Sequence, residues 1–258
     1  MVKINFETSR IAIIGSTILT KSLISYLQNV NNPKILMALP KEEIKIKANG
    51  VSLERLCNNL KIKYIENNSW DYFGKECIAK KINLIIEFGD SRIIPSKIIK
   101  NFFTIGNHGA SLPTVKGGAS LVWGRLANLN EWGVSLMNIS NGIDNGDIIA
   151  KKKFIYSDNT TMSEFVQIAD RTTLECLEEL VIAGTYNPIK NSYDSEIRIE
   201  KHYDSFLAVK KMKDCINQGK TIYMPPRTIK DSKINYDWPG EFIEIFKIAN
   251  NDPYPKFY

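Results

Sequence analysis

Short apolar runs alternate with segments of helical periodicity through the first 105 residues. Residues 10–30 begin with an apolar run, bend at Gly15-Ser16-Thr17 and continue with apolar positions at helical spacing, which predicts a strand, a turn and a helix. The same alternation predicts strands at 35–39, 62–65, 83–88 and 102–105 and helices at 53–60, 72–80 and after Pro95. Such alternation is typical of a parallel sheet covered by helices. We therefore expect an α/β fold with a Rossmann-like, mostly parallel sheet flanked by helices.

The middle of the chain predicts a hairpin and a long helix. Two extended segments, 133–139 and 148–156, flank the polar turn NGIDNGD, as in an antiparallel hairpin. Thr161 and Glu164 fit a helix-capping box, a regular apolar face follows, and Gly184 is a suitable stop. We expect this helix to pack on the sheet.

The pattern loosens beyond Asn187, where Tyr, Asn, Lys and a pair of prolines replace the regular alternation. A change of pattern of this kind indicates a boundary between structural units. We therefore divide the chain into a main Rossmann-like domain at 1–188 and a small C-terminal α+β unit at 189–258.

The net charge of the chain and its distribution indicate which class of partner the protein binds. The 258 residues include 34 Lys and Arg and 28 Asp and Glu, for a net charge of +6. Binding to nucleic acid usually requires a concentrated basic face, whereas here the excess is spread along the chain. A small anionic substrate fits this balance better than nucleic acid.

Cysteine usage and hydropathy exclude several further classes. The four cysteines are far apart, form no CxxC pair and have only two histidines, His108 and His202, to complete a metal site. We expect reduced thiols, no metal and no disulfides. No run reaches the ~18 apolar residues of a membrane span, so we predict a cytoplasmic protein without a membrane partner.

The first segment that suggests chemistry is FTIGNHGASLPTVKGG at 103–118. It places Asn107 and His108 just beyond a predicted strand, where ligands bind in open α/β sheets. Gly106 and Gly109 flank the pair and allow the backbone to bend and a substrate to approach closely. A structural histidine with satisfied hydrogen bonds is the alternative, and the residues alone leave both open.

The second segment is the turn at 141–147, which carries the carboxylates of Asp144 and Asp147. Ordinary hairpin chemistry explains Asp and Asn before Gly, and calcium binding is disfavoured because the EF-hand glutamate is absent. Combined with the first segment, however, the turn supplies the parts needed for acyl transfer to an amine. An amide and an imidazole can donate to a developing oxyanion, while a carboxylate orients the imidazole. Direct attack by the amine needs no nucleophilic Ser or Cys.

Three ordered runs carry a family resemblance: LIIEFGDSRIIPSKII, IGNHGASLPTVKGG and WGVSLMNISNGIDNGDII. They resemble formyltransferases that use 10-formyltetrahydrofolate, including methionyl-tRNA formyltransferase and the nucleotide-sugar N-formyltransferases. The segment YMPPRTIKDSKINYDWPGEFIEIFKIANNDPYPKF resembles the family's C-terminal signature. The resemblance implies that residues 1–188 form the catalytic domain and that His108 and Asp144 are catalytic. Gly106 stands at the position of the family's Asn, and we predict that Asn107 supplies the amide instead.

The resemblance also implies binding residues. Ser91, Arg92, Ile93 and Asn141 would line the pterin pocket, although a helix N-terminus and a tight turn explain these residues equally. Gly15, Ser16 and Thr17 lie at a strand-to-helix turn, where backbone N–H groups favour a phosphate, and a plain helix cap is the alternative. Lys116 would meet a diphosphate, with a solvated surface lysine as the alternative.

The implied reaction moves a formyl group from 10-formyltetrahydrofolate to the amino group of a nucleotide-linked amino sugar, as in the synthesis of lipopolysaccharide and O-antigen precursors. The C-terminal region has 12 basic and 10 acidic side chains from residue 190 onward, which disfavours transfer RNA. Methionyl-tRNA formyltransferase and a catalytically silent binding relative remain as alternatives. The expected partner is a small nucleotide sugar, with monomer and homodimer both open.

Overall fold

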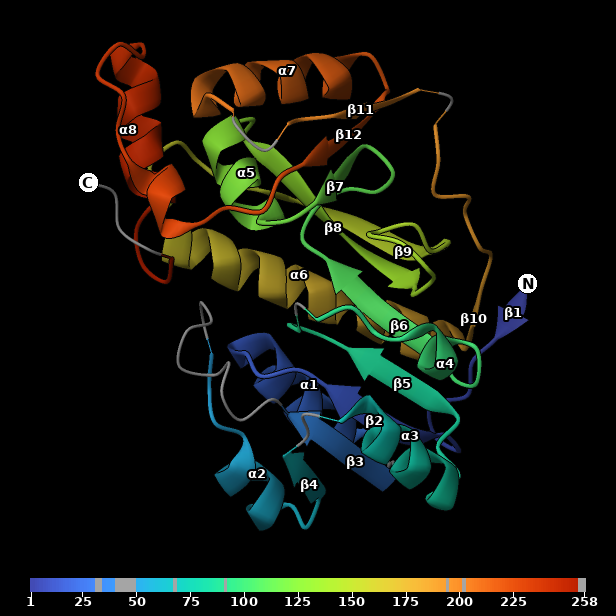
Figure 1. The fold of residues 1–258 in the computed structure, drawn as a ribbon. Coiled ribbons are helices and arrows are strands. Elements are labelled where there is room, and N and C mark those ends of the chain that lie inside the picture. Colours follow the sequence, from blue (N-terminus) through green and yellow to red (C-terminus); the bar gives the residue numbers. More distant parts are fainter. Residues whose placement is uncertain are drawn as a thin grey trace.

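A seven-stranded sheet forms the centre of the computed structural model (Figure 1). The structure describes residues 1–30, 34–39, 50–66, 69–90, 92–193, 195–200 and 203–254. The strands, in their order across the sheet, are β4 (Lys63–Glu66), β3 (Lys34–Leu39), β2 (Arg10–Ile14), β5 (Leu84–Glu87), β6 (Phe103–His108), β8 (Glu131–Asn138) and β9 (Ile148–Ile155). Neighbours from β4 to β6 pair in parallel, whereas β8 and β9 are antiparallel additions at one edge. The predicted Rossmann-like, mostly parallel sheet is confirmed.

Helices cover both faces of this sheet because its central strands are apolar on both sides. In β2, Ile11 and Ile13 pack with α1 (Ile18–Asn29), α2 (Glu54–Asn59) and α6 (Met162–Ala183). Ala12 and Ile14 pack with α3 (Trp70–Ala79) and α4 (Ser96–Ile99) on the other face. Successive strand residues point to opposite faces, so this alternation assigns each helix to its layer.

The long helix α6 begins and ends as its sequence predicts. The Thr161 backbone N–H donates to Glu164 Oε2 at 2.8 Å, and the Glu164 N–H donates to Thr161 Oγ1 at 3.2 Å. Gly184 ends the helix with a φ of 61°, a conformation that glycine adopts without strain. The predicted hairpin is also confirmed, since β8 and β9 pair antiparallel around the 141–147 turn.

Strand β6 is longer than predicted. The expected strand ends at Ile105, with Asn107 and His108 beyond it, but the observed strand continues to His108. The parallel partner β5 supports it only as far as Gly106. Antiparallel pairing with β8 carries it further, with Asn107 opposite Leu136 and His108 opposite Ser135. The two polar residues therefore lie within the sheet and are fixed by its pleat.

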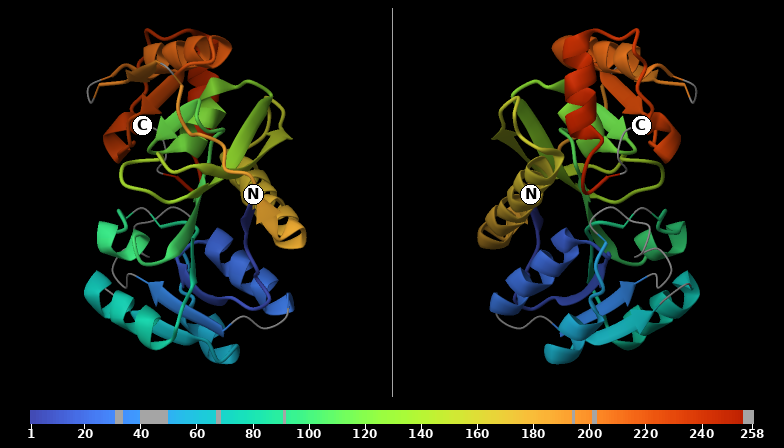
Figure 2. Two further views of the ribbon diagram at one scale, coloured as in Figure 1. Left: turned by 90° about the vertical axis from the view of Figure 1, so that its right-hand side faces the viewer. Right: turned by 90° about the vertical axis from the view of Figure 1, so that its left-hand side faces the viewer.

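The last third of the chain packs against the middle of the sequence. Strand β12 (Thr221–Met224) pairs in parallel with β7 (Val115–Gly117) on one side and with β11 (Glu196–Arg198) on the other. The remaining elements are α5 (Ser120–Ala127), β1 (Val2–Lys3) paired with β10 (Thr185–Tyr186), α7 (Ser205–Asn217), a 3₁₀ turn (Ile229–Ser232) and α8 (Gly240–Ala249). Figure 2 shows α7 and α8 at the end of the molecule opposite β3 and β4.

A shared apolar core joins these C-terminal elements to the preceding ones. Trp123 on α5 is fully buried and belongs to one cluster with Met212 of α7 and Phe246 of α8. The Trp123 Nε1–H donates to the Pro225 carbonyl at 2.9 Å. The division of the chain at residue 188 remains a prediction.

We expect Asp170 on α6 to make the stability of the fold depend on pH. Burial raises the pKa of Asp170 to about 7, and burial together with the charge of Asp170 raises the pKa of the Tyr254 hydroxyl. Because the folded chain binds the Asp170 proton more tightly than the unfolded chain, the free energy of unfolding should fall as pH rises from about 4 to about 7. We expect Asp170→Asn to remove roughly 1–3 kcal/mol of this fall, measured by denaturant unfolding at pH 5 and pH 8.

The exposed Glu178 on the same helix provides a matched control. Glu178→Gln removes one carboxylate from α6 without changing the packing against Tyr254, so it should keep the wild-type pH dependence. An Asp170→Asn variant with an unchanged pH dependence would show that this carboxyl is not its source.

Candidate active site

The structure brings His108 and Asp144 together from separate parts of the chain. His108 ends β6, and Asp144 lies in the turn between β8 and β9. The His108 Nδ1 atom is 3.5 Å from Asp144 Oδ1. The two side chains are only 6% and 13% exposed, so solvent screens the pair weakly. An imidazole beside a carboxylate is a common arrangement in general acid–base catalysis.

A backbone contact fixes the protonation of the His108 ring. The Nε2 atom lies 3.0 Å from the carbonyl oxygen of Val115. A carbonyl can only accept, so Nε2 carries a hydrogen and donates it. Nδ1 is therefore the ring nitrogen that gains or loses a proton, and it is the one that faces Asp144.

Asp144 is held at its other oxygen. Its Oδ2 accepts a hydrogen bond of 2.7 Å from the backbone N–H of Gly117 on β7. The backbone of Asp144 has a φ of 49°, in the left-handed region that few residues other than glycine adopt. The carboxylate thus connects β7 to the His108 ring, and the turn is constrained rather than free.

Asn107 does not join this pair, which corrects the prediction that it supplies a catalytic amide. Adjacent strand residues point to opposite faces, so Asn107 and His108 diverge. The cross-strand neighbour of Asn107 is Leu136, which belongs to the core on the α1 and α6 side. The prediction failed because it placed both residues in a loop, where the pleat would not separate them.

Gly106 lies on the same face of β6 as His108, two residues earlier in the strand. A Cβ atom at Gly106 would lie 2.7 Å from Ile139 Cδ1 and 3.3 Å from Glu87 Oε2. Glu87 is 8% exposed at the end of β5, and its Oε1 accepts a 2.7 Å hydrogen bond from the Asp90 N–H. Sequence reasoning overlooked Glu87, although an acidic residue closing the apolar run LIIE was a visible signal.

Two loops predicted to bind the pterin lie against each other. The Ser96 hydroxyl donates to Asn141 Oδ1 at 2.8 Å, which ties the start of α4 to the 141–147 turn. Each loop exposes an isoleucine, Ile93 at 79% and Ile143 at 56%. Exposed apolar side chains on adjacent loops suit the faces of a flat ring.

Arg92 and Ser91 are the other two residues predicted for this pocket. The Arg92 side chain turns toward α3. It bonds Asp90 Oδ2 at 2.9 Å, and its guanidinium carbon lies 4.7 Å from the Trp70 ring centroid. Ser91 lies outside the described residues.

The Gly15-Ser16-Thr17 turn is covered by protein. All three residues are buried, and the Ser16 carbonyl accepts a 2.9 Å hydrogen bond from the Val51 N–H. A Cβ atom at Gly15 would overlap the Phe88 carbonyl oxygen, so the turn packs directly on the chain after β5. The predicted phosphate contact is not supported, and close packing between neighbouring strand ends explains the glycine.

Lys116 is inside the protein, which corrects the prediction that it meets a diphosphate. Its side chain is 1% exposed, and its ammonium donates to the Asn191 carbonyl at 2.9 Å and to Asn145 Oδ1 at 3.1 Å. Burial lowers the pKa of Lys116. This burial could not be predicted from the residues around Lys116, because the strand β12 that covers it begins more than 100 residues later.

The described part of the chain contains no cluster of three or more His, Cys, Asp or Glu side chains arranged to hold a metal ion. All four cysteines are free and buried. Within the same described ranges, no helix combines the length and apolar character needed to cross a bilayer.

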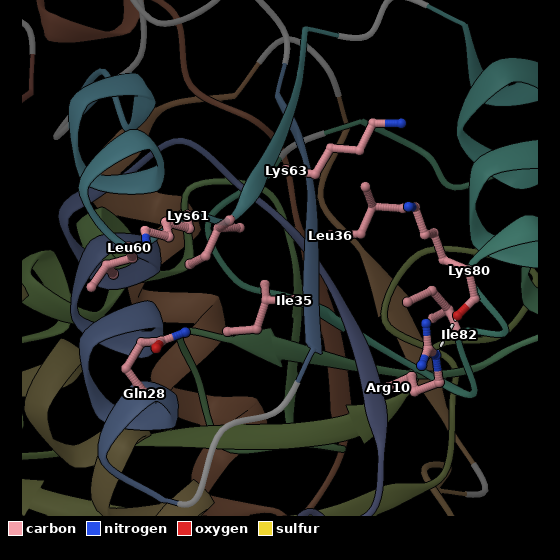
Figure 3. Close-up of a pocket in the computed structure, with 10 residues that line it drawn as sticks. Arg10, Gln28, Ile35, Leu36, Leu60, Lys61, Lys63, Lys80 and Ile82 are labelled. Carbon is pink, nitrogen blue, oxygen red and sulfur yellow. Dashed lines mark hydrogen bonds between the residues drawn. The ribbon is translucent and has the colours of Figure 1, made fainter.

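A separate cavity of about 560 Å³ lies at the opposite edge of the sheet (Figure 3). Arg10 and Lys63 begin strands β2 and β4, and both line this cavity, whereas His108 is at the carboxyl end of β6. Arg10 donates to the Lys80 carbonyl there, as the dashed line in Figure 3 marks. The cavity is therefore not part of the candidate site.

The fold and the paired His108 and Asp144 define a Rossmann-type protein with a candidate acid–base site at the carboxyl end of its sheet. The chain is 22% identical over 203 residues to methionyl-tRNA formyltransferase of Bacillus pumilus, covering 76% of this chain and 63% of that protein. No family model matches the chain. The match spans less than two thirds of the length of this relative.

Two solved structures share the fold. An N-formyltransferase from Helicobacter canadensis, in complex with folinic acid and dTDP-3-aminofucose, superposes with a TM-score of 0.67 at 18% identity, covering 94% of this chain and 80% of that one. WlaRD, a sugar 3N-formyltransferase with dTDP and 5-N-formyl-THF, gives a TM-score of 0.65 at 20% identity, covering 96% and 80%.

Proposed function

We propose that the chain transfers a formyl group from 10-formyltetrahydrofolate to the amino group of a nucleotide-linked amino sugar. The observation that carries the proposal is the approach of His108 Nδ1 to Asp144 Oδ1 at 3.5 Å, at the carboxyl end of the sheet. Ligands of open α/β sheets bind at this edge. The ligands of the two structural neighbours support the assignment of both substrates: folinic acid and dTDP-3-aminofucose in one, 5-N-formyl-THF and dTDP in the other.

The side chains of the site accept the proton that the attacking amine loses. The amine bonds to the formyl carbon of the folate donor, the bond between that carbon and N10 of the folate breaks, and the proton that the amine loses passes through the site to N10. His108 Nδ1 takes this proton, because Nε2 is already committed to the Val115 carbonyl. Asp144 then stabilises the imidazolium across 3.5 Å. Direct attack by the amine requires no covalent intermediate on the protein.

The pterin would bind between the loop at 92–95 and the turn at 141–147. Ile93 and Ile143 would lie against its faces, and the Ser96 to Asn141 hydrogen bond would hold the two loops at a fixed separation. Apolar side chains that are exposed in the free protein lose this exposure on binding, which favours the complex.

The pterin pocket predicts a selective effect of Ile93→Asp. Placing a charge where a ring face binds should raise the KM for the folate donor about tenfold, equivalent to about 1.4 kcal/mol, while the KM for the sugar changes less than twofold. Initial rates with each substrate varied in turn measure both constants. Ile182→Asp, at the equally exposed Ile182 on α6, is the control. An unchanged folate KM in Ile93→Asp would exclude this loop from the pocket.

A nucleotide sugar is preferred over transfer RNA as acceptor because the basic excess is small and spread out. Incubating the protein with 10-formyltetrahydrofolate and a panel of amino-sugar nucleotides, followed by mass spectrometry, tests the proposal through a product 28 Da heavier, the mass of an added CO. A parallel incubation with initiator methionyl-tRNA at several salt concentrations tests the alternative acceptor. Formylation of the transfer RNA alone would overturn the proposed acceptor.

A catalytically silent binding relative is the second candidate, and Gly106 favours it. The family resemblance assigns an Asn to this position, and here the space is closed by Ile139 and Glu87. Calorimetry with folate and with each sugar nucleotide separates the two candidates. Tight binding of both without any formylated product would favour the silent protein.

A further inference from the structure

Asp144 needs outside support for the backbone conformation it adopts. Its φ of 49° and the φ of 97° at Gly142 give the turn two left-handed residues. Left-handed backbone at a residue with a side chain costs free energy and persists only where surrounding contacts determine it. The contacts that hold Asp144 are therefore part of the machinery that presents its carboxylate to His108.

Asn191 supplies two of these contacts from a different part of the chain. Its Nδ2 donates to the carbonyl oxygens of Asp144 and Gly146, each at 2.8 Å. Asn191 is 4% exposed and follows Ile189, whose backbone exchanges hydrogen bonds of 2.8 and 2.9 Å with Ile148 at the start of β9. The side-chain amide of Asn191 thus holds the turn at the two residues that flank Asn145.

Lys116 and Tyr223 complete the support. The Lys116 ammonium donates to the Asn191 carbonyl at 2.9 Å and to Asn145 Oδ1 at 3.1 Å. The Tyr223 hydroxyl donates to Asn145 Oδ1 at 2.8 Å. Lys116 and Tyr223 are register partners on β7 and β12, so the sheet holds both at fixed positions.

We infer that Asn191 is a positioning residue for Asp144, and that Asn191, Lys116 and Tyr223 form a clamp through which the C-terminal segment orients the carboxylate that faces His108. This inference rests on the proposed function, because the orientation matters only if the pair handles a proton. Asn191 touches neither reacting atom and acts through the backbone of the turn. A displacement of a catalytic group by about 1 Å is enough to lower a rate strongly.

Asn191→Ala tests the clamp through kinetics. The substitution leaves the carbonyls of Asp144 and Gly146 without their amide donor, so kcat should fall about 10- to 100-fold while the KM of each substrate stays within twofold. Ser192→Ala, at the exposed neighbouring residue, should keep wild-type constants. Tyr223→Phe removes only the hydroxyl and should lower kcat about three- to tenfold in a folded protein. A wild-type kcat in folded Asn191→Ala would overturn the inference.

Nitrogen NMR of the histidine rings tests the clamp without enzymatic activity. The chain has two histidines, so His202→Asn assigns the His108 signals directly. Asn191→Ala should move the His108 Nδ1 signal by at least a third of the displacement caused by Asp144→Asn, and Ser192→Ala should leave it in place. If wild-type protein transfers no formyl group, the proposed function fails and this measurement alone decides the clamp. An unmoved signal in Asn191→Ala beside a displaced one in Asp144→Asn would overturn it.

Discussion

His108→Ala is expected to lower kcat by about 10²–10⁴-fold, the range over which a positioned acid–base group accelerates proton transfer. Nε2 is bonded to Val115, and Nδ1 faces Asp144, so no other ring nitrogen is placed to take the amine proton. The KM values should change little, because the ring is 6% exposed and offers a substrate little binding surface. Single-turnover formation of the formylated sugar measures the effect on the chemical step.

Asp144→Asn keeps the shape of the side chain and separates charge from packing. Because the two residues act as a unit, the double variant should be no slower than His108→Ala alone. Asp147→Asn, at the exposed second carboxylate of the same turn, should retain wild-type rates. Rates near wild type in both His108→Ala and Asp144→Asn would eliminate the proposed mechanism.

The sheet and the long helix could be predicted because their signals are local. The apolar run of β2, Ile11 to Ile14, predicts a buried strand from a few consecutive letters. The ends of α6 are set by Thr161, Glu164 and Gly184, which act within a few residues of each helix end. Each of these features depends on neighbours in sequence, and each was confirmed.

The candidate site was predicted in part, and its errors share one cause. His108 and Asp144 were identified from their motifs, and the structure places them together. Asn107 and Lys116 were assigned wrongly because strands far away in the sequence decide where they point. Pairing with β8 turns Asn107 away from His108, and β12 covers Lys116. The clamp residue Asn191 was not found for the same reason, since it bonds to a turn more than 40 residues earlier.

Gly117 connects these distant elements, and its replacement should have the largest effect on stability. Its φ of 99° lies in the region that side chains avoid, and a Cβ atom there would overlap the Met224 carbonyl oxygen on β12. Because that obstacle is backbone, the variant can relieve the overlap only by opening the pairing of β7 with β12. We expect Gly117→Ala to lower the free energy of unfolding by roughly 3–5 kcal/mol, measured by urea denaturation.

Gly240→Ala supplies the matched control for this substitution. Gly240 begins α8, and no atom lies within 4 Å of the position of an added Cβ. Alanine there should be neutral or stabilise by about 0.5 kcal/mol, since it restricts the unfolded chain and favours the helix. Equal stability in the two variants would mean that β7 and β12 are not closely paired. The Gly117 N–H that holds Asp144 Oδ2 would then lose its fixed position, and Asp144 would lose one of the hydrogen bonds that orient its carboxylate at His108.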